Sequence, residues 1–282
     1  MKPAVIVHGG AGPIKDDSLA QRLEGCQAAA LAAWEILEEN GSALDAAEAA
    51  VVVLEDNPLF NAGFGSTLNS VGRVEMDAAI MDGETLRAGA VAAVEGIKNP
   101  IKLARRIMDD GRHVILGGQG ALLFARSVGF PECSPDSLIA AHEKKRWQDK
   151  HGTVGCVTLD GTGKIAVATS TGGVFNKFPG RIGDSPLPGC GTYADERGGV
   201  SCTGLGEAII RIVMGRTAID FLSECADPSA AAHQALALLQ AKTGAQAGLI
   251  IIDRQGQIGY GRSTPHMPVC SITGDGRIAL DH

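Results

Sequence analysis

The order of helical and hairpin patterns is the feature that most restricts how this chain can fold. Helical spacing over residues 19–37, 42–54, 100–108 and 121–128 precedes a hairpin pattern over 153–169, and helical stretches at 204–214 and 228–239 precede a second hairpin over 248–262. Short apolar runs at 4–7, 74–81 and 88–94 predict further strands. Because the turns at 160–163 and 254–256 join neighbouring strands directly, we expect an α+β fold with mostly antiparallel sheets covered by helices, rather than repeated βαβ units.

The composition is typical of a single globular domain spanning residues 1–282. Hydrophobic residues make up 45% of the chain and charged residues 20%, which suffices for a large core. The net charge is −7 and no basic stripe occurs, so nucleic acid is not an expected partner. No run of 18 apolar residues occurs, so the sequence also predicts no membrane span.

Cysteine usage and the N-terminus indicate the compartment. The seven cysteines are widely spaced and form no C-x-x-C pair, which is typical of reduced, buried thiols. The apolar stretch at 4–7 is too short for a signal peptide and continues into an expected strand. We therefore expect a cytoplasmic protein.

Residues 131–152 are the strongest linker candidate. Their second half is polar and charged and shows no clear apolar period, in contrast to the flanking segments. A strand pattern begins immediately afterwards, at Thr153.

Several common catalytic motifs are absent. The chain has no H-E-x-x-H, no G-x-S-x-G and no Walker A loop. Residues 117–120 (GGQG) follow a short apolar run but do not complete a dinucleotide-binding G-x-G-x-x-G. The remaining candidates for catalytic residues lie mainly within 151–207.

Thr153 lies at the seam between the polar segment and a buried strand. Taken alone, a threonine at a strand start reflects ordinary β propensity. A threonine that follows a chain cleavage is different, because its free α-amine, with a pKa near 8, can act as the base for its own hydroxyl. Gly152 suits such a cut, since glycine tolerates a strained backbone and leaves the scissile carbonyl open to attack.

Three further groups suit the same chemistry, although each has an ordinary structural interpretation. Thr171 ends the strand that pairs with the one starting at Thr153, so the two side chains should lie close together. Arg181 and Asp184 can form a local ion pair, or together bind the carboxylate and ammonium groups of an amino acid. A Thr203-Gly204 pair before a helix can be a plain N-cap or present N–H donors to an oxyanion.

The residues above occur in segments that identify a family resemblance. The sequence resembles the plant-type asparaginases, a family of N-terminal-nucleophile hydrolases that also act as isoaspartyl aminopeptidases. The matching segments run in the family's order from the start of the chain to about residue 210: HGGAG (8–12), NPLFNAGFGS (57–66), MDAAIMDG (76–83), HGTVGCVTLD (151–160), ATSTGG (168–173), PGRIGDSPLPG (179–189) and SCTGLGE (201–207).

The resemblance implies a role for each matching residue. Thr153 is the nucleophile and the new N-terminus after cleavage at Gly152, and Thr171 hydrogen-bonds and activates it. Arg181 binds the α-carboxylate of the substrate and Asp184 its α-ammonium group. The remaining site residues are the oxyanion-stabilising Thr203 and Gly204, and Asn61, which lies near the nucleophile.

The resemblance also implies a fold, an assembly and a cation. The family fold is a four-layer αββα sandwich, cut into an α subunit (1–152) and a β subunit (153–282) that pair and then dimerise. No catalytic cofactor is implied. A structural sodium ion is expected on backbone carbonyls of the loop at 54–64, contributed by Leu54, Glu55, Asn57, Phe60, Ala62 and Phe64.

The implied reaction is hydrolysis of L-asparagine or of β-aspartyl dipeptides through a β-aspartyl-threonine ester, without a preference between the two substrates. A glycosylasparaginase shares the nucleophile and the Arg/Asp pair, but commonly has Asp before the threonine. The intact Arg181/Asp184 pair for a free amino acid argues against a taspase-like endopeptidase. An uncleaved small-molecule binding protein that uses the same pair stays open. The departures from the family pattern are Cys190 and Thr192, which we expect to line the site, and Pro265 and His266, of which His266 would add a titrating group near the pocket.

Overall fold

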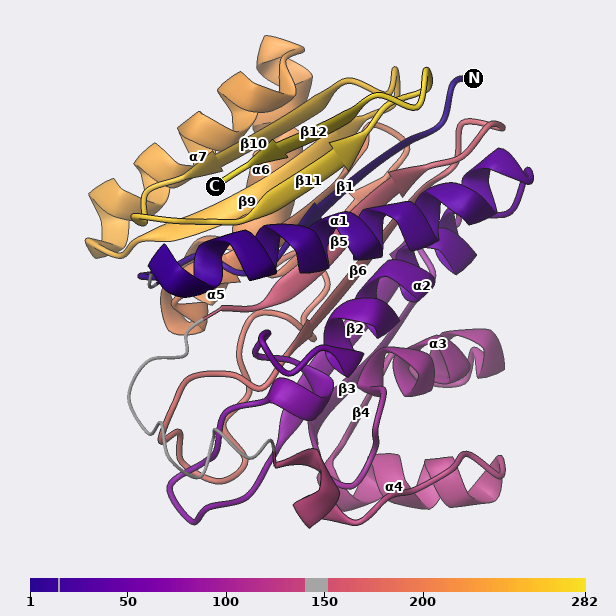
Figure 1. Cartoon of the computed structure of the whole chain (residues 1–282), viewed down its shortest axis with the longest axis vertical. Coiled ribbons are helices and arrows are strands. Elements are labelled where there is room, and N and C mark those ends of the chain that lie inside the picture. Colours follow the sequence, from indigo (N-terminus) through magenta and orange to yellow (C-terminus); the bar gives the residue numbers. More distant parts are fainter. Residues whose placement is uncertain (15, 140–151) are drawn as a thin grey trace.

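The computed structural model describes residues 1–14, 16–139 and 152–282 and contains two β-sheets (Figure 1). The larger sheet has eight strands in the order β12-β11-β1-β5-β6-β2-β3-β4. Every pairing in it is antiparallel except β3 with β4. The strands are β1 (Ala4–His8), β2 (Met76–Asp82), β3 (Ala88–Val94), β4 (Ile115–Gly117), β5 (Val154–Leu159), β6 (Ile165–Thr171), β11 (Val269–Ile272) and β12 (Ile278–Asp281).

The smaller sheet has four antiparallel strands in the order β10-β9-β8-β7. These strands are β7 (Thr192–Asp195), β8 (Gly198–Gly204), β9 (Ala247–Asp253) and β10 (Ile258–Arg262). The two expected hairpins are confirmed as β5–β6 and β9–β10. Asp160 closes the first turn, since its Oδ1 accepts hydrogen bonds from the N–H groups of Thr162 and Lys164 at 2.8 and 3.1 Å.

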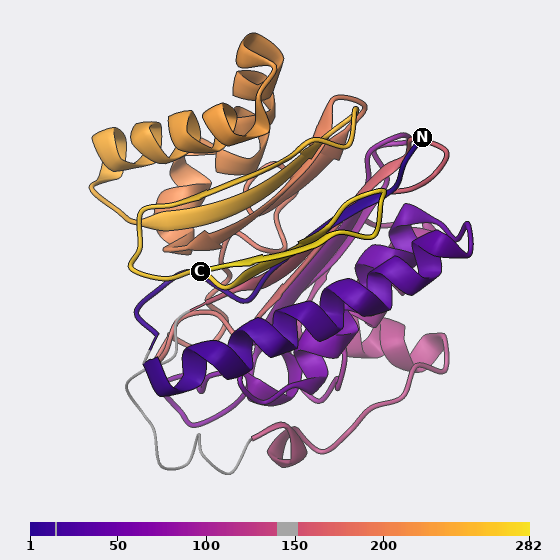
Figure 2. The same ribbon diagram turned by 45° about the horizontal axis from the view of Figure 1, so that its top comes forward.

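Seven α-helices cover the two sheets in the described residues. Those packed with the larger sheet are α1 (Asp16–Glu38), α2 (Ala43–Asp56), α3 (Pro100–Asp110) and α4 (Gly118–Ser127). The smaller sheet is covered by α5 (Gly206–Ile212), α6 (Met214–Cys225) and α7 (Pro228–Thr243). Figure 2 shows the indigo and purple helices on one side of the molecule and the orange helices on the other.

Three buried apolar clusters occupy the interfaces between these elements. One lies between the first four helices and the larger sheet, and another between α5–α7 and the smaller sheet. A third joins the sheets, with Ile6, Val157 and Val167 of the larger sheet meeting Ile250 and Ile252 of the smaller one. The α+β class expected from the sequence is therefore confirmed.

The helix expected over 204–214 is wrong in its bounds. Strand β8 extends to Gly204, α5 begins at Gly206, and the chain breaks at Val213, whose φ of 50° is left-handed, before α6. By contrast, α2 begins close to the expected position, and Ser42 caps it: its side chain accepts a hydrogen bond from the Asp45 N–H at 3.1 Å. Within the GGQG segment at 117–120, Gly117 ends the three-residue strand β4 and Gly118 begins α4.

The first part of the linker candidate 131–152 is folded against the body. A 3₁₀ helix, η2 (Pro135–Leu138), occupies it, and Leu138 is buried in the larger core. Residues 140–151 lie outside the described residues. All seven cysteines are free thiols, five of them buried. Among the described residues, no helix is long and apolar enough to cross a membrane.

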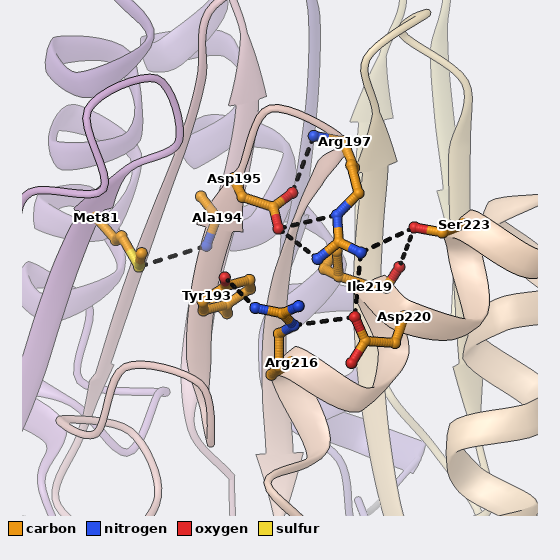
Figure 3. A network of polar contacts seen from close by, with 9 residues as sticks. All are labelled: Met81, Tyr193, Ala194, Asp195, Arg197, Arg216, Ile219, Asp220 and Ser223. Atoms are coloured by element: carbon orange, nitrogen blue, oxygen red, sulfur yellow. Dashed lines mark hydrogen bonds and ion pairs between the residues drawn. The ribbon is translucent and has the colours of Figure 1, made fainter.

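A network of ion pairs fixes the turn between β7 and β8 to α6 (Figure 3). Asp195 accepts from the Arg197 backbone N–H at 2.9 Å and from its guanidinium Nε at 3.0 Å. Arg197 and Arg216 both contact Asp220, at 3.1 and 2.9 Å. Strand β8 runs from this network to Thr203 and Gly204, so the network anchors the start of a strand whose other end reaches the candidate site.

Candidate active site

A small pocket opens where the start of β5 and the ends of β6 and β8 meet the loop at 172–184. Six residues singled out in the sequence line it together with Gly173 and Val174: Gly152, Thr153, Thr171, Arg181, Asp184 and Gly204. The structure therefore gathers residues from four separated segments around one space.

Thr153 is buried immediately before β5, and its backbone is tied to the smaller sheet. Its N–H donates a hydrogen bond to Oγ1 of Thr203 at 3.2 Å, and the same oxygen accepts from the N–H of Ala11 at 3.0 Å. Thr203 is itself fully buried near the end of β8 rather than at a helix start. One hydroxyl thus holds together the 8–12 segment, the expected cleavage point and the smaller sheet.

The peptide before Thr153 passes very close to Gly10. A Cβ placed on Gly10 would lie 2.6 Å from the Gly152 Cα and 2.9 Å from its carbonyl carbon. Both glycines also have left-handed φ values, +97° for Gly10 and +137° for Gly152. Side chains are therefore excluded at this crossing both by space and by backbone conformation.

Thr171 ends β6 beside the start of β5, where Val154 pairs with Ser170. Its Oγ1 accepts a hydrogen bond from the Gly173 N–H at 2.9 Å. Asn61 lies behind this turn: its Nδ2 donates to the Gly173 carbonyl at 2.7 Å and its own carbonyl accepts from Gly172 at 2.9 Å. Asn61 thus holds the turn that follows Thr171 and contacts the site through the backbone.

Arg181 is held in a bidentate ion pair by Glu207 at the start of α5. Its Nε and Nη2 each donate to one carboxylate oxygen at 2.8 Å. The side chain of Arg181 is 14% exposed and that of Glu207 is 54% exposed. This pairing, more than any other contact, raises the pKa of Arg181 against the effect of burial, so the guanidinium stays charged. Its Nη1 is directed toward Gly183, where an added Cβ would lie 2.8 Å away.

Asp184 is buried with one carboxylate oxygen, Oδ2, lacking a hydrogen-bond partner among the described residues. Burial raises the pKa of this carboxyl to about 7, although its own backbone N–H and Arg181 oppose the shift. Space around it is kept by glycines: a Cβ on Gly191 or Gly206 would lie 2.6 or 2.8 Å from its carboxylate oxygens. A buried carboxylate that lines a pocket is well suited to bind an ammonium group.

Comparison with known proteins decides the family. The sequence pattern of the asparaginase family matches residues 1–151 and 146–279. The chain belongs to the asparaginase family. Its relatives include the plant-type L-asparaginase of Pyrococcus abyssi, 46% identical over 94% of both chains. The isoaspartyl peptidase/L-asparaginase of Homo sapiens is 46% identical over 91% of this chain and 88% of its own, and that of Xenopus laevis is 42% identical over 98% and 94%.

The residues that depart from the asparaginase pattern are not among the described residues that line the pocket. Cys190 and Thr192 flank Gly191, where an added Cβ would lie 2.6 Å from Asp184 Oδ2, and the Thr192 hydroxyl donates to the Ser185 carbonyl at 2.9 Å. His266 pairs with Gly12 through backbone bonds, and its ring stacks on His282 with centroids 6.0 Å apart. Neither His266 nor its neighbour Pro265 is among the described residues that line the pocket.

His8, the buried histidine that begins the HGGAG segment of this asparaginase, has no separate role predicted from the sequence. The Nε2 of His8 lies 3.0 Å from the Ser201 hydroxyl, which lies 2.8 Å from that of Thr169, so a polar chain crosses between the sheets. Burial lowers the pKa of His8 to about 3, and the nearby backbone of Thr153 opposes this shift. His8 is therefore neutral at physiological pH.

The buried groups behind the Arg181 loop were also missed. Glu75, Asp77 and Lys177 are all buried and contact this loop or each other. A charged residue inside a predicted core strand is a usable signal, and Asp77, which precedes the apolar run 78–81 of β2, provides it. Lys177 carries no such signal, because it lies in a short segment with Pro and Gly, VFNKFPG, that has no helix or strand period.

Proposed function

We propose that this asparaginase hydrolyses L-asparagine and β-aspartyl dipeptides, using Thr153 as the nucleophile after its own chain is cut between Gly152 and Thr153. The observation that carries the proposal is the joint lining of one pocket by Thr153, Arg181 and Asp184. Relatives at 42–46% identity named for these two amidohydrolase activities support the substrate class.

The arrangement supports a two-step mechanism. Cleavage turns the Thr153 N–H, now bound to Thr203 Oγ1, into a free α-amine that can take the proton from the Thr153 hydroxyl. Thr171 supports that hydroxyl. The oxygen attacks the side-chain carbonyl of the substrate, ammonia or the downstream peptide leaves, and water hydrolyses the resulting β-aspartyl ester to release aspartate and restore Thr153.

Recognition follows from the two charged ends of the substrate. Arg181 is a cation for the α-carboxylate, and the carboxylate of Asp184, which lines the same pocket, is an acceptor for the α-ammonium group. The Gly204 N–H and Thr203 are proposed to stabilise the oxyanion that forms on the attacked carbonyl, with Asn61 holding the turn beside it.

The fold and assembly expected of the family extend this proposal. Helices outside two stacked sheets are compatible with the four-layer αββα sandwich of N-terminal-nucleophile hydrolases, with 1–152 and 153–282 as the two subunits of a heterodimer that pairs with a second. The free thiols support a cytoplasmic location. We propose small molecules and a second copy as partners, and neither nucleic acid nor membrane.

A structural sodium ion fits the loop after α2. The carbonyls of Leu54, Asn57 and Ala62 each accept one backbone hydrogen bond, which leaves a second lone pair free for a hard cation. The carbonyls of Phe60 and Glu55 crowd Gly65 and Gly63, where an added Cβ would lie 2.1 and 2.4 Å away, so the loop turns tightly on itself. The ion, with Phe64 as the remaining expected ligand, would hold this loop and supply no chemistry.

The proposal is tested by intact-mass analysis and a denaturing gel of purified protein after several days at neutral pH. Cleavage before Thr153 divides the 29.0 kDa chain into pieces of about 16 and about 13 kDa, the lighter one beginning Thr-Val-Gly-Cys. Thr153→Ala should remain whole and inactive. A wild-type chain that stays whole and hydrolyses neither L-asparagine nor β-Asp-Leu would contradict the proposal and favour a binding protein. Preference for a glycosylated asparagine would indicate a glycosylasparaginase-like activity instead.

A further inference from the structure

Two buried carboxylates from the start of β2 bind the backbone of the loop that carries Arg181. Glu75 directly precedes β2 and Asp77 is its second residue; they are 7% and 0% exposed. Alternate residues of an extended strand point to the same side, so both reach the loop at 177–184, here called the clamp loop. Neither residue is among the described residues that line the pocket.

Glu75 contacts the clamp loop just before Arg181. Both of its carboxylate oxygens accept from the Gly180 N–H at 3.1 Å, and its backbone carbonyl accepts from Lys177 Nζ at 2.7 Å. Gly180 has a left-handed φ of +82° and lies in the turn closed by the bond from the Arg181 N–H to the Phe178 carbonyl at 3.0 Å. Glu75 therefore fixes the turn from which Arg181 projects.

Asp77 contacts the clamp loop between Arg181 and Asp184. Its Oδ2 accepts from the Gly183 N–H at 3.1 Å, while Oδ1 accepts from the Ala93 N–H at 2.8 Å. The register of β2 with β3 shifts between Met76 and Ala78, so Asp77 lies at an irregularity where the Ala93 N–H is taken by a side chain. One carboxylate thus joins the larger sheet to the clamp loop.

The charges around these contacts balance one another. An added Cβ on Gly173, which lines the pocket, would lie 3.1 Å from Lys177 Nζ and 3.2 Å from Arg181 Nη1. Burial lowers the pKa of Lys177 and raises that of Asp77, and each of these two groups opposes the shift of the other. The two cations near the pocket wall thus face two carboxylates from β2.

We propose that Glu75 and Asp77 are positioning residues for the substrate: by holding the N–H groups of Gly180 and Gly183, they set the clamp loop so that Arg181 and Asp184 face the zwitterionic end of asparagine. The inference rests on the proposed function and deepens it. Because both carboxylates act on the clamp and not on Thr153, their loss weakens substrate binding and leaves the chemical step unchanged.

The experiment compares Glu75→Gln and Asp77→Asn with wild type and with Asp110→Asn, an exposed carboxylate paired with Arg112. We expect KM for L-asparagine and the dissociation constant for L-aspartate to rise about tenfold in the first two, as is typical when a charged hydrogen-bond partner is lost. The kcat should stay within about twofold, and the chain should still split before Thr153. Equal KM values in all four proteins, or a parallel loss of kcat and of splitting, overturn the proposal.

A double-mutant cycle separates positioning from general loss of structure. In an Arg181→Met background the clamp is already broken, so adding Glu75→Gln should change kcat/KM for L-asparagine by less than about twofold. If Glu75→Gln lowers kcat/KM by the same factor in the Arg181→Met background as in wild type, the proposal is contradicted. This measurement also decides the case if Asp77→Asn fails to fold.

A wild-type chain that hydrolyses nothing would sink the proposed function and not, by itself, this inference. Calorimetry with L-aspartate then supplies the test. Tighter binding by wild type than by Glu75→Gln supports positioning, whereas equal binding, or none by wild type, overturns it.

Discussion

The backbone N–H of Thr153 donates a hydrogen bond to the side-chain oxygen of Thr203 across 3.2 Å. Thr153 directly precedes β5 of the larger sheet, whereas Thr203 lies in β8 of the smaller sheet. The same oxygen also accepts from Ala11 at 3.0 Å, so Thr203 is a common partner of the expected cleavage point and of the segment packed against it.

Thr203→Val should therefore slow self-cleavage and hydrolysis together. Valine keeps the shape of threonine but leaves two buried N–H groups without an acceptor, which costs roughly 1–3 kcal/mol per group. We expect the splitting rate and kcat to fall at least about tenfold, measured by time-resolved gel and ammonia release. Thr203→Ser should restore much of both. Thr243→Val, which removes a hydroxyl bonded within α7, serves as the control, and equal behaviour of the two valine variants would refute the role of Thr203.

Gly10→Ala should block the cleavage geometry. The added methyl would meet the Gly152 Cα at 2.6 Å, and the left-handed φ of +97° adds backbone strain. Gly72→Ala is the matched control, because its φ of +77° is similarly left-handed but nothing lies within 4 Å of its added Cβ. We expect both variants to lose about 1 kcal/mol from backbone strain. Only Gly10→Ala should also remain uncleaved, as read by intact mass.

The affinity for substrate should fall below neutral pH through Asp184. Burial raises the pKa of this carboxyl to about 7, and only its ionised form attracts an ammonium group. KM for L-asparagine should therefore be about tenfold higher at pH 6 than at pH 8. A flat KM over this range would show that Asp184 does not bind the ammonium group as a free carboxylate.

The same carboxyl should lower stability as the pH rises. Its folded pKa of about 7 exceeds the ordinary 3.8, so between these values the folded chain retains a proton that the unfolded chain releases. Stability from this group is complete at acid pH and decreases as pH rises through this window. Asp184→Asn should thus raise the melting temperature relative to wild type at pH 8 and hardly at pH 4, by calorimetry, while abolishing substrate affinity.

Glu207→Gln tests whether the ion pair with Arg181 orients the guanidinium. Glu207 occupies Nε and Nη2 and leaves Nη1 for the pocket side, so its loss should raise KM about threefold with little effect on stability, as expected for a partly exposed pair. Glu132→Gln is the control, because Glu132 binds Arg126 in the same bidentate geometry at 2.8 Å. A lower KM in Glu207→Gln would mean instead that Glu207 competes with the substrate carboxylate.

Local patterns were sufficient to predict the hairpins and six of the eight described residues that line the pocket. The β5–β6 hairpin brings Thr171 beside Thr153 through a short turn, and Arg181 and Asp184 lie three positions apart in one loop. Strands β7, β8, β11 and β12 were not predicted. Strand β8 contains three glycines, which have low β propensity, and it becomes a strand because β7 and β9 pair with it.

The sequence by itself determined the class of fold and the family, and it named the residues proposed to carry the chemistry, because these depend on periodicity and on motifs within short segments. Only the tertiary structure decided that Gly10 crosses Gly152, that Thr203 holds the Thr153 N–H, and that Glu75 and Asp77 hold the clamp loop. Each of these contacts joins residues about 50 to about 140 positions apart. Such pairs meet only when separate strands pair and the two sheets stack, and the burial that results is what makes each missing or unpaired polar group costly.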